Sequence, residues 1–306
     1  MTANMGATPR HNGATLVRTV DGELAGMDSG PAPLGPTLEE LVNRSELSTN
    51  TVLGHLSWSG NASLASGGTS TVFALVIGAI NAVMIYDGTG YSSKASAGET
   101  LTLAHVQGAP AALASNTRYY AYAKLSGVNG ALAFEVSSTP PSANGVFKNG
   151  DPTQVYLRGA TFVTDGSGNP LPFRCVHGRY RYSITGMPAS INDLRVLNGT
   201  ASATAWADID LSSLVPPYAR NIHLRAQVIN GVNNKTGRAQ FRTKGHTSGS
   251  IDLDVAEMGA SGTANYNQLH FDLECDANRA IQYQRADGGG TYADLDVFVW
   301  VLGWDE

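Results

Sequence analysis

Hydrophobic and polar residues alternate through the C-terminal part of the chain with the two-residue period of β-strands. The clearest runs are Asn221 to Val228, Arg238 to Thr243, Ile251 to Val255, Gln268 to Leu273 and Ile281 to Gln284. Together with Trp206 to Leu211 and the terminal run, they make about seven strands, a number typical of a two-sheet sandwich. We therefore predict that residues 191–306 form an antiparallel, jelly-roll-like β-sandwich.

The terminal run, residues 291–304, changes character halfway along. Its first half places Asp294 and Asp296 on one face of the predicted strand. From Phe298 onward, the same face of the strand carries large apolar side chains. Such a face must be shielded from water, either by another part of this chain or by a second copy of it. We predict that a second copy covers it and that the aromatic residues of this face form a subunit interface: Phe298, Trp300 and Trp304.

The chain before residue 191 divides into three parts. Residues 1–36 are rich in Gly and Pro and lack apolar periodicity, so we predict an extended anchoring arm that becomes ordered along another surface. Residues 37–50 predict one short helix that begins with a capping box at Thr37 and Glu40. Residues 51–190 predict a middle β domain, so the fold class is mainly β. The helix packs either on its own domain or at a symmetry axis, and for the latter its contact residues are Leu38, Leu41 and Val42.

Composition narrows the classes of function. Only 15% of the residues are charged and the net charge is −5, which argues against nucleic acid as a partner. The longest apolar run, Val72 to Ile85, is too short and too interrupted to insert into a membrane. The N-terminal sequence does not have the pattern of a secretory signal peptide. Cys175 and Cys275 lie far apart in strand-like sequence, which indicates two small buried side chains and no disulfide framework.

The sequence contains no convincing reaction centre. Its seven histidines are scattered, with no pair at a recognisable metal-ligand spacing. We therefore predict no catalytic residue, no metal site and no cofactor. Paired carboxylates on one strand face could bind a cation or flank a glycosidic bond, but the opposite face of each strand is apolar, which favours a solvated sheet face. These pairs are Asp208 and Asp210, Asp252 and Asp254, and Asp294 and Asp296.

Two regions resemble known proteins of bacteriophage particles. Lys148-Asn149-Gly150-Asp151-Pro152-Thr153, followed by an aliphatic strand and Thr164-Asp165-Gly166-Ser167-Gly168, resembles a segment that recurs in phage fibre proteins. The preceding strands, with Tyr119-Tyr120-x-Tyr122 and the run Ala131 to Ser137, are similar too. The departure is Phe173-Arg174-Cys175-Val176, where a more apolar strand ending in Phe is usual. Asp210 to Pro216, Phe241 to Gly245, Ile281 to Tyr283 and Val301 to Trp304 resemble the C-terminal β-sandwich domain of many phage virion proteins.

The resemblance implies a structural virion protein, assembled in the host cytoplasm, that forms a homotrimeric tail fibre or spike. Residues 1–50 would then attach the subunit to other virion proteins at the tail or capsid. A head fibre or capsid decoration protein is the alternative, and a hydrolase of surface polysaccharide is less favoured because long β-helix repeats are missing. The C-terminal domain would face the host, with a glycan as the expected ligand. We predict its contact face from the polar positions of two strands: His223, Arg225, Gln227, Arg238, Gln240 and Arg242.

Overall fold

The computed structural model describes most of the chain between residue 62 and residue 306, together with two short segments nearer the N-terminus. The described residues are 16–18, 24–26, 62–65, 67–86, 91–127, 130–142, 147–151, 156–183, 190–199, 205–230, 237–255, 265–274, 276–286 and 295–306. The predicted helix over residues 37–50, with Leu38, Leu41 and Val42, lies outside them. Within the predicted arm, only β1 (Leu16–Arg18) and β2 (Leu24–Gly26) are described, and they pair antiparallel.

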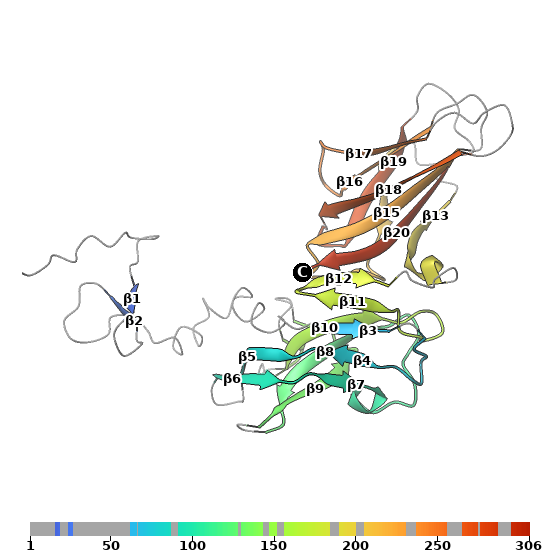
Figure 1. The fold of residues 1–306 in the computed structure, drawn as a ribbon. Helices are drawn as coiled ribbons and strands as arrows, with labels where there is room; N and C mark the ends of the chain where they lie inside the picture. The colour runs from blue at the N-terminus through green and yellow to red at the C-terminus, as the bar shows by residue number, and fades with distance from the viewer. Residues whose placement is uncertain are drawn as a thin grey trace, which may run out of the picture.

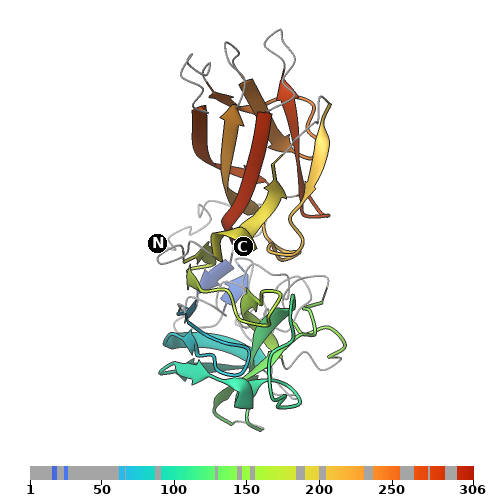
Figure 2. The same cartoon turned by 90° about the vertical axis from the view of Figure 1, so that its right-hand side faces the viewer.

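The described residues form a mainly β structure of several antiparallel sheets. One group of strands, β3 to β10, lies in the lower half of the molecule and another, β13 to β20, in the upper half, with β11 and β12 between them (Figure 1). Figure 2 shows the same division after a quarter turn. Two short 3-10 helices are the only helices among the described residues: η1 (Leu103–His105) and η2 (Ser190–Leu194).

The lower half contains a three-stranded sheet, a two-stranded sheet and part of a larger sheet. Strands β8 and β9 form an antiparallel hairpin, paired from Tyr120–Ser137 to Leu125–Leu132. The strands of this half are β3 (Ala62–Leu64), β4 (Leu75–Ile77), β5 (Ile80–Tyr86), β6 (Tyr91–Ser96), β7 (Glu99–Leu101), β8 (Arg118–Leu125), β9 (Leu132–Ser137) and β10 (Leu157–Val163). The two strands between the halves are β11 (Phe173–Val176) and β12 (Arg179–Tyr182).

The upper half consists of two sheets whose apolar faces meet. One sheet has the order β14-β19-β16-β17, and it faces β18, β15 and β20, which belong to the larger sheet. Phe241 of the first sheet lies 5.1 Å from Phe271 of the second, measured between ring centroids. The strands are β13 (Arg195–Asn198), β14 (Ala207–Asp210), β15 (Asn221–Asn230), β16 (Gly237–Thr243), β17 (Ile251–Val255), β18 (Asn265–Glu274), β19 (Ala280–Ala286) and β20 (Leu295–Asp305).

The alternation read from the sequence decides which face of each upper strand is buried. Along β15, the side chains of Ile222, Leu224, Ala226 and Val228 are at most 1% exposed, whereas Arg225 and Gln227 between them are only half-buried. A strand that buries every second residue gains hydrophobic free energy only on one face, so its partner sheet must lie on that side.

Strand β20 joins the two halves into one sheet. Along one edge it pairs with β15 over the whole length of that strand. Its other edge is shared, because β13 pairs with its first part and β12 with its end. The resulting sheet runs β18-β15-β20-β12-β11-β3-β4-β7 and therefore crosses from the upper half into the lower half.

A β-bulge at the end of β20 changes the face on which Trp304 lies. Val301 pairs with Leu224 and Gly303 with His223, so Leu302 has no partner on β15. One extra residue reverses the alternation of all later side chains. Trp304 consequently lies opposite the buried residue Ile222.

The prediction that Trp304 contacts a second copy is wrong, because the chain itself covers this side chain. Trp304 is 1% exposed and its ring stacks on that of Tyr180 at 4.6 Å, with Tyr182 edge-on at 5.5 Å. Trp300 remains on the face predicted for it, but Arg225 and the stacked Phe298 ring lie against it and it is only 6% exposed. The middle part of the chain therefore supplies the cover for Trp304 that the sequence left open.

A short 3-10 helix interrupts an alternating stretch of the lower half. Leu101 and Leu103 alternate with Thr100 and Thr102 as in a strand, but β7 ends at Leu101 and residues 103–105 form η1. Thr102 and His105 make a reciprocal capping box, in which the His105 ring accepts a hydrogen bond from the Thr102 backbone N–H at 3.1 Å. This local bond ends the strand.

Candidate functional site: the outer face of the β14-β19-β16-β17 sheet

The six polar residues predicted as one contact face belong to two separate sheets. His223, Arg225 and Gln227 lie on β15, whereas Arg238, Gln240 and Arg242 lie on β16 of the facing sheet. Because the two sheets bury their apolar residues against each other, the polar residues of each point outward, away from the other sheet. The prediction of a single six-residue face is therefore wrong, and each set of three must be considered by itself.

The β15 set is largely engaged within the chain. His223 is 8% exposed, with Nδ1 2.5 Å from an Asp272 carboxylate oxygen and Nε2 2.9 Å from one of Asp305. The guanidinium of Arg225 lies 5.0 Å from the Trp300 ring centroid. These contacts leave little of His223 or Arg225 to recognise a ligand.

The β16 set, in contrast, joins polar residues of all the neighbouring strands. Register places Arg242 beside Gln282 of β19, and Gln282 beside Asp208 of β14. In the next row, Gln240 lies between Gln284 of β19 and Asp252 of β17. We call this set the polar ladder, and its members are Asp208, Arg238, Gln240, Arg242, Lys244, Asp252, Asp254, Gln282 and Gln284.

Hydrogen bonds run across the polar ladder from strand to strand. Arg242 Nε donates to Gln282 Oε1 at 2.9 Å, and Gln282 Nε2 donates to Asp208 at 3.0 Å. In the second row, Gln284 Nε2 donates to Gln240 Oε1 at 2.7 Å, and Gln240 Nε2 donates to Asp252 at 3.0 Å. The face therefore presents donors and acceptors in fixed alternation, held by a rigid sheet.

An aromatic ring borders the polar ladder. Trp206 precedes β14, and the guanidinium of Arg242 lies 3.8 Å from its ring centroid. The ring is half-buried, so part of it stays open to solvent. A Trp ring beside amide and carboxylate groups is the combination that contacts both the apolar and the hydroxyl sides of a sugar.

Charge on the polar ladder is balanced by ion pairs. Lys244 Nζ lies 2.5 Å from Asp208, and Arg238 contacts both Asp254 and Asp252. The hydrogen bonds from Lys244 and Gln282 hold the pKa of the Asp208 carboxyl below its usual value. The hydrogen bond to Asp254 raises the pKa of Arg238. A face with paired charges and abundant amides suits an uncharged, hydroxyl-rich ligand better than a phosphate.

The sequence did not identify Trp206, Gln282 and Gln284 as members of this site. Gln282 and Gln284 lie on β19, which pairs with β16, and Trp206 precedes β14, the strand beyond β19, so only the pairing of the strands brings the three together. The interpretation of Asp208, Asp252 and Asp254 as a solvated sheet face agrees with their exposure. Within the described part of the chain, no three His, Cys, Asp or Glu side chains form a metal-binding group.

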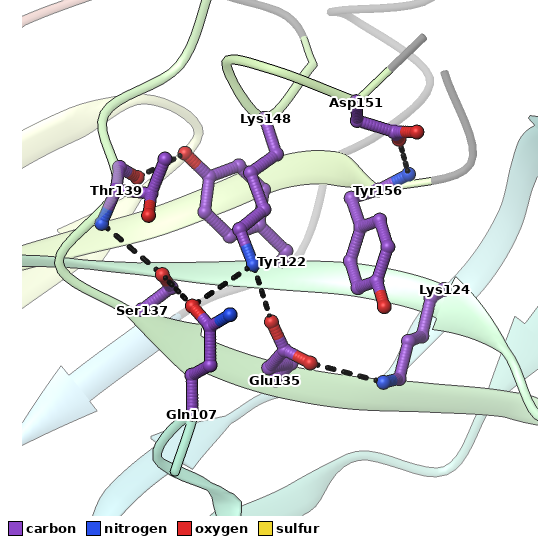
Figure 3. A network of polar contacts seen from close by, with 9 residues as sticks. All are labelled: Gln107, Tyr122, Lys124, Glu135, Ser137, Thr139, Lys148, Asp151 and Tyr156. Carbon is purple, nitrogen blue, oxygen red and sulfur yellow. Dashed lines mark hydrogen bonds and ion pairs between the residues drawn. The ribbon is translucent and has the colours of Figure 1, made fainter. Parts of the chain in front are cut away.

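A second polar cluster lies partly buried in the lower half, around Lys148 (Figure 3). Lys148 Nζ lies 2.6 Å from Glu135 Oε1 and 3.2 Å from Gln107 Oε1. Lys124 Nζ contacts the other oxygen of Glu135 at 3.1 Å. Burial by itself would raise the pKa of the Glu135 carboxyl, but the two lysines outweigh that effect and lower it.

Three tyrosines of β8 are part of the core. Tyr119, Tyr120 and Tyr122 are 5%, 4% and 0% exposed, so their rings offer no surface for a sugar to stack on. Tyr122 donates its hydroxyl hydrogen to the Thr139 carbonyl at 2.9 Å, which satisfies the buried polar atom.

No protein-family model matches the chain, and a search of curated proteins finds no match. In the described part of the chain, neither 3-10 helix is long or apolar enough to cross a membrane.

Proposed function

We propose that this chain is a structural virion protein of a bacteriophage, a subunit of a homotrimeric tail fibre or spike. Residues 1–50 attach it to other virion proteins, and its C-terminal half, as a jelly-roll-like β-sandwich, binds a glycan on the host surface. Support comes from the two resembling regions in the sequence and from the mainly β architecture. The observation that carries the binding role is the polar ladder with Trp206 at its border.

Binding on this face requires no catalysis. Sugar hydroxyls form hydrogen bonds with the amide and carboxylate groups of the polar ladder, and the Trp206 ring covers an apolar sugar face. An open sheet face gives weak affinity at each site. Three copies in one fibre raise the overall affinity through effective concentration, because the second and third contacts are intramolecular.

Binding of the purified protein to a panel of bacterial surface polysaccharides tests this role. Gln240→Ala together with Trp206→Ala should weaken binding at least tenfold, because both an amide contact and the stacking surface are lost. Gln227→Ala is the matched control, since Gln227 occupies the outer face of the other sheet and should leave binding unchanged. Equal binding by all variants would remove the polar ladder from the proposal.

Two further measurements address assembly and location. Light scattering of the purified protein should give three copies per particle, and a monomer would refute the fibre subunit as proposed. Antibody raised against Val215 to Glu306 should label the tail in electron micrographs of the virion. Label confined to the capsid would identify a head fibre or decoration protein instead.

A further inference from the structure

The partly buried cluster around Lys148 brings an amine, a carboxylate and a carboxamide into contact. Lys148 Nζ lies 2.6 Å from Glu135 Oε1 and 3.2 Å from Gln107 Oε1 (Figure 3). Lys148 is 9% exposed, which is unusual for a lysine. The rings of Tyr156 and Tyr122 flank its ammonium group, with centroids 4.8 Å and 5.8 Å from Nζ.

The backbone fixes Gln107 in this place. Its N–H donates to the Val136 carbonyl at 2.7 Å, directly after a parallel bridge between Val106 and Val136. Strand β9 presents Glu135 and Ser137 on one face, two residues apart. Gln107 therefore lies beside both groups.

The carbonyl oxygen of Gln107 also has a second hydrogen-bond donor. Ser137 Oγ, in a residue only 1% exposed, donates to Gln107 Oε1 at 2.7 Å. Thr139 N–H donates to Ser137 Oγ at 3.1 Å, which occupies an acceptor position of that oxygen and directs its hydrogen toward Gln107. Donors on a carbonyl oxygen stabilise the negative charge that develops there when a nucleophile attacks the carbon.

The cluster holds more positive than negative side chains. Two ammonium groups, from Lys148 and Lys124, share the single carboxylate of Glu135. Lys124 is the more exposed, with 30% of its side chain accessible against 10% for Lys148. Converting Lys148 into a neutral amide leaves one ammonium for one carboxylate and removes the more deeply buried charge.

We propose that Lys148 and Gln107 form an intramolecular isopeptide bond, with Glu135 as the catalytic acid and base and Ser137 as the oxyanion donor. Glu135 takes a proton from the Lys148 ammonium, and the free amine attacks Gln107 Cδ. Glu135 passes that proton to Gln107 Nε2 and takes a second one from the attacking nitrogen. The carbon–Nε2 bond breaks, the carbonyl reforms and ammonia leaves with the proton held by Glu135. The sum is one ammonium and one carboxamide converted to one amide and NH₄⁺, with no oxidant or reductant.

Such a bond would covalently link the segment before β8 to the segment after β9. Gln107 and Lys148 are 41 positions apart in the chain, so the bond closes a loop that contains both β8 and β9. A covalent loop restricts the unfolded chain as a disulfide does, but reductants do not cleave it. The inference concerns the lower half alone and does not depend on what the polar ladder binds.

Mass spectrometry of the full-length protein tests the proposal. The intact mass should be lower than the sequence mass by one ammonia, about 17 Da. After proteolysis, the peptide with Gln107 should be joined to the peptide with Lys148. The joined peptides decide the matter, because Asn149-Gly150 could lose ammonia by ring closure, but that leaves the two peptides separate.

Variants assign the roles. Lys148→Arg and Glu135→Gln should each abolish the joined peptide, while circular dichroism verifies that the β structure is retained. Lys124→Arg is the matched control, since it keeps a cation on the second oxygen of Glu135 and should still give the joined peptide. Wild-type protein in which the two peptides remain separate after prolonged storage in the folded state would overturn the proposal, whatever the variants do.

Discussion

Trp304 packs at the junction of the two halves, and Trp304→Ala measures its contribution to stability. The substitution removes a side chain that is 1% exposed. Replacing a buried Trp by Ala costs about 3–5 kcal/mol. We expect the upper end of that range, because the ring contacts with Tyr180 at 4.6 Å and Tyr182 at 5.5 Å are lost together, and each such pair contributes about 0.5–1.5 kcal/mol.

Equilibrium unfolding in urea gives the free energy, and light scattering of the same samples gives the number of copies. Trp304→Ala should reduce the free energy of unfolding by about 4–5 kcal/mol without changing the oligomeric state, because the lost contacts are within one chain. Tyr266→Ala is the control, since Tyr266 is 66% exposed and should change stability by less than about 0.5 kcal/mol. A loss below about 1 kcal/mol, or dissociation into smaller species with unchanged unfolding, would refute the assignment of Trp304 to the interior of one chain.

Three other predictions follow from local geometry. Gly303→Ala should destabilise the protein strongly in a thermal melt, because its Cβ would collide with a backbone carbonyl of β12; unchanged melting would show that the bulge is not as tight as described. NMR titration should give Asp208 a pKa below its usual value in the wild type and close to that value in Lys244→Met. Because folding lowers this pKa, its contribution to stability exists above the usual pKa of an aspartate and is lost as the pH falls through the folded value. Burial raises the pKa of Cys175 to about 12, so in a Cys275→Ser background the folded protein should resist alkylation at neutral pH, and rapid labelling would contradict its burial.

The alternation of residues was sufficient to find the upper strands, but it could not assign them to sheets. Arg225 and Arg242 occupy equivalent positions in two alternating strands. The structure places one over Trp300 and the other over Trp206, on outward faces of different sheets. Alternation reports only the direction of a side chain relative to its own strand, whereas a shared surface requires the pairing order, which depends on contacts far apart in the chain.

Strand β20 shows the same limit within one element. Period-two counting from Phe298 puts Trp304 on the same face as Trp300. The bulge at Leu302 reverses that count, and no residue type near it signals the insertion apart from Gly303, which tolerates the close approach of β12.

The sequence by itself determined the mainly β class, the position of most strands and the aromatic stretch at the end of the chain, because these follow from local periodicity and side-chain volume. Tertiary structure alone decided that β20 pairs with both halves, that the middle part of the same chain covers Trp304, and that Gln107, Glu135 and Lys148 meet in one partly buried cluster. The physical reason is that strand pairing joins residues from distant parts of the chain, and which strands pair is fixed by the packing of the whole core rather than by any one segment.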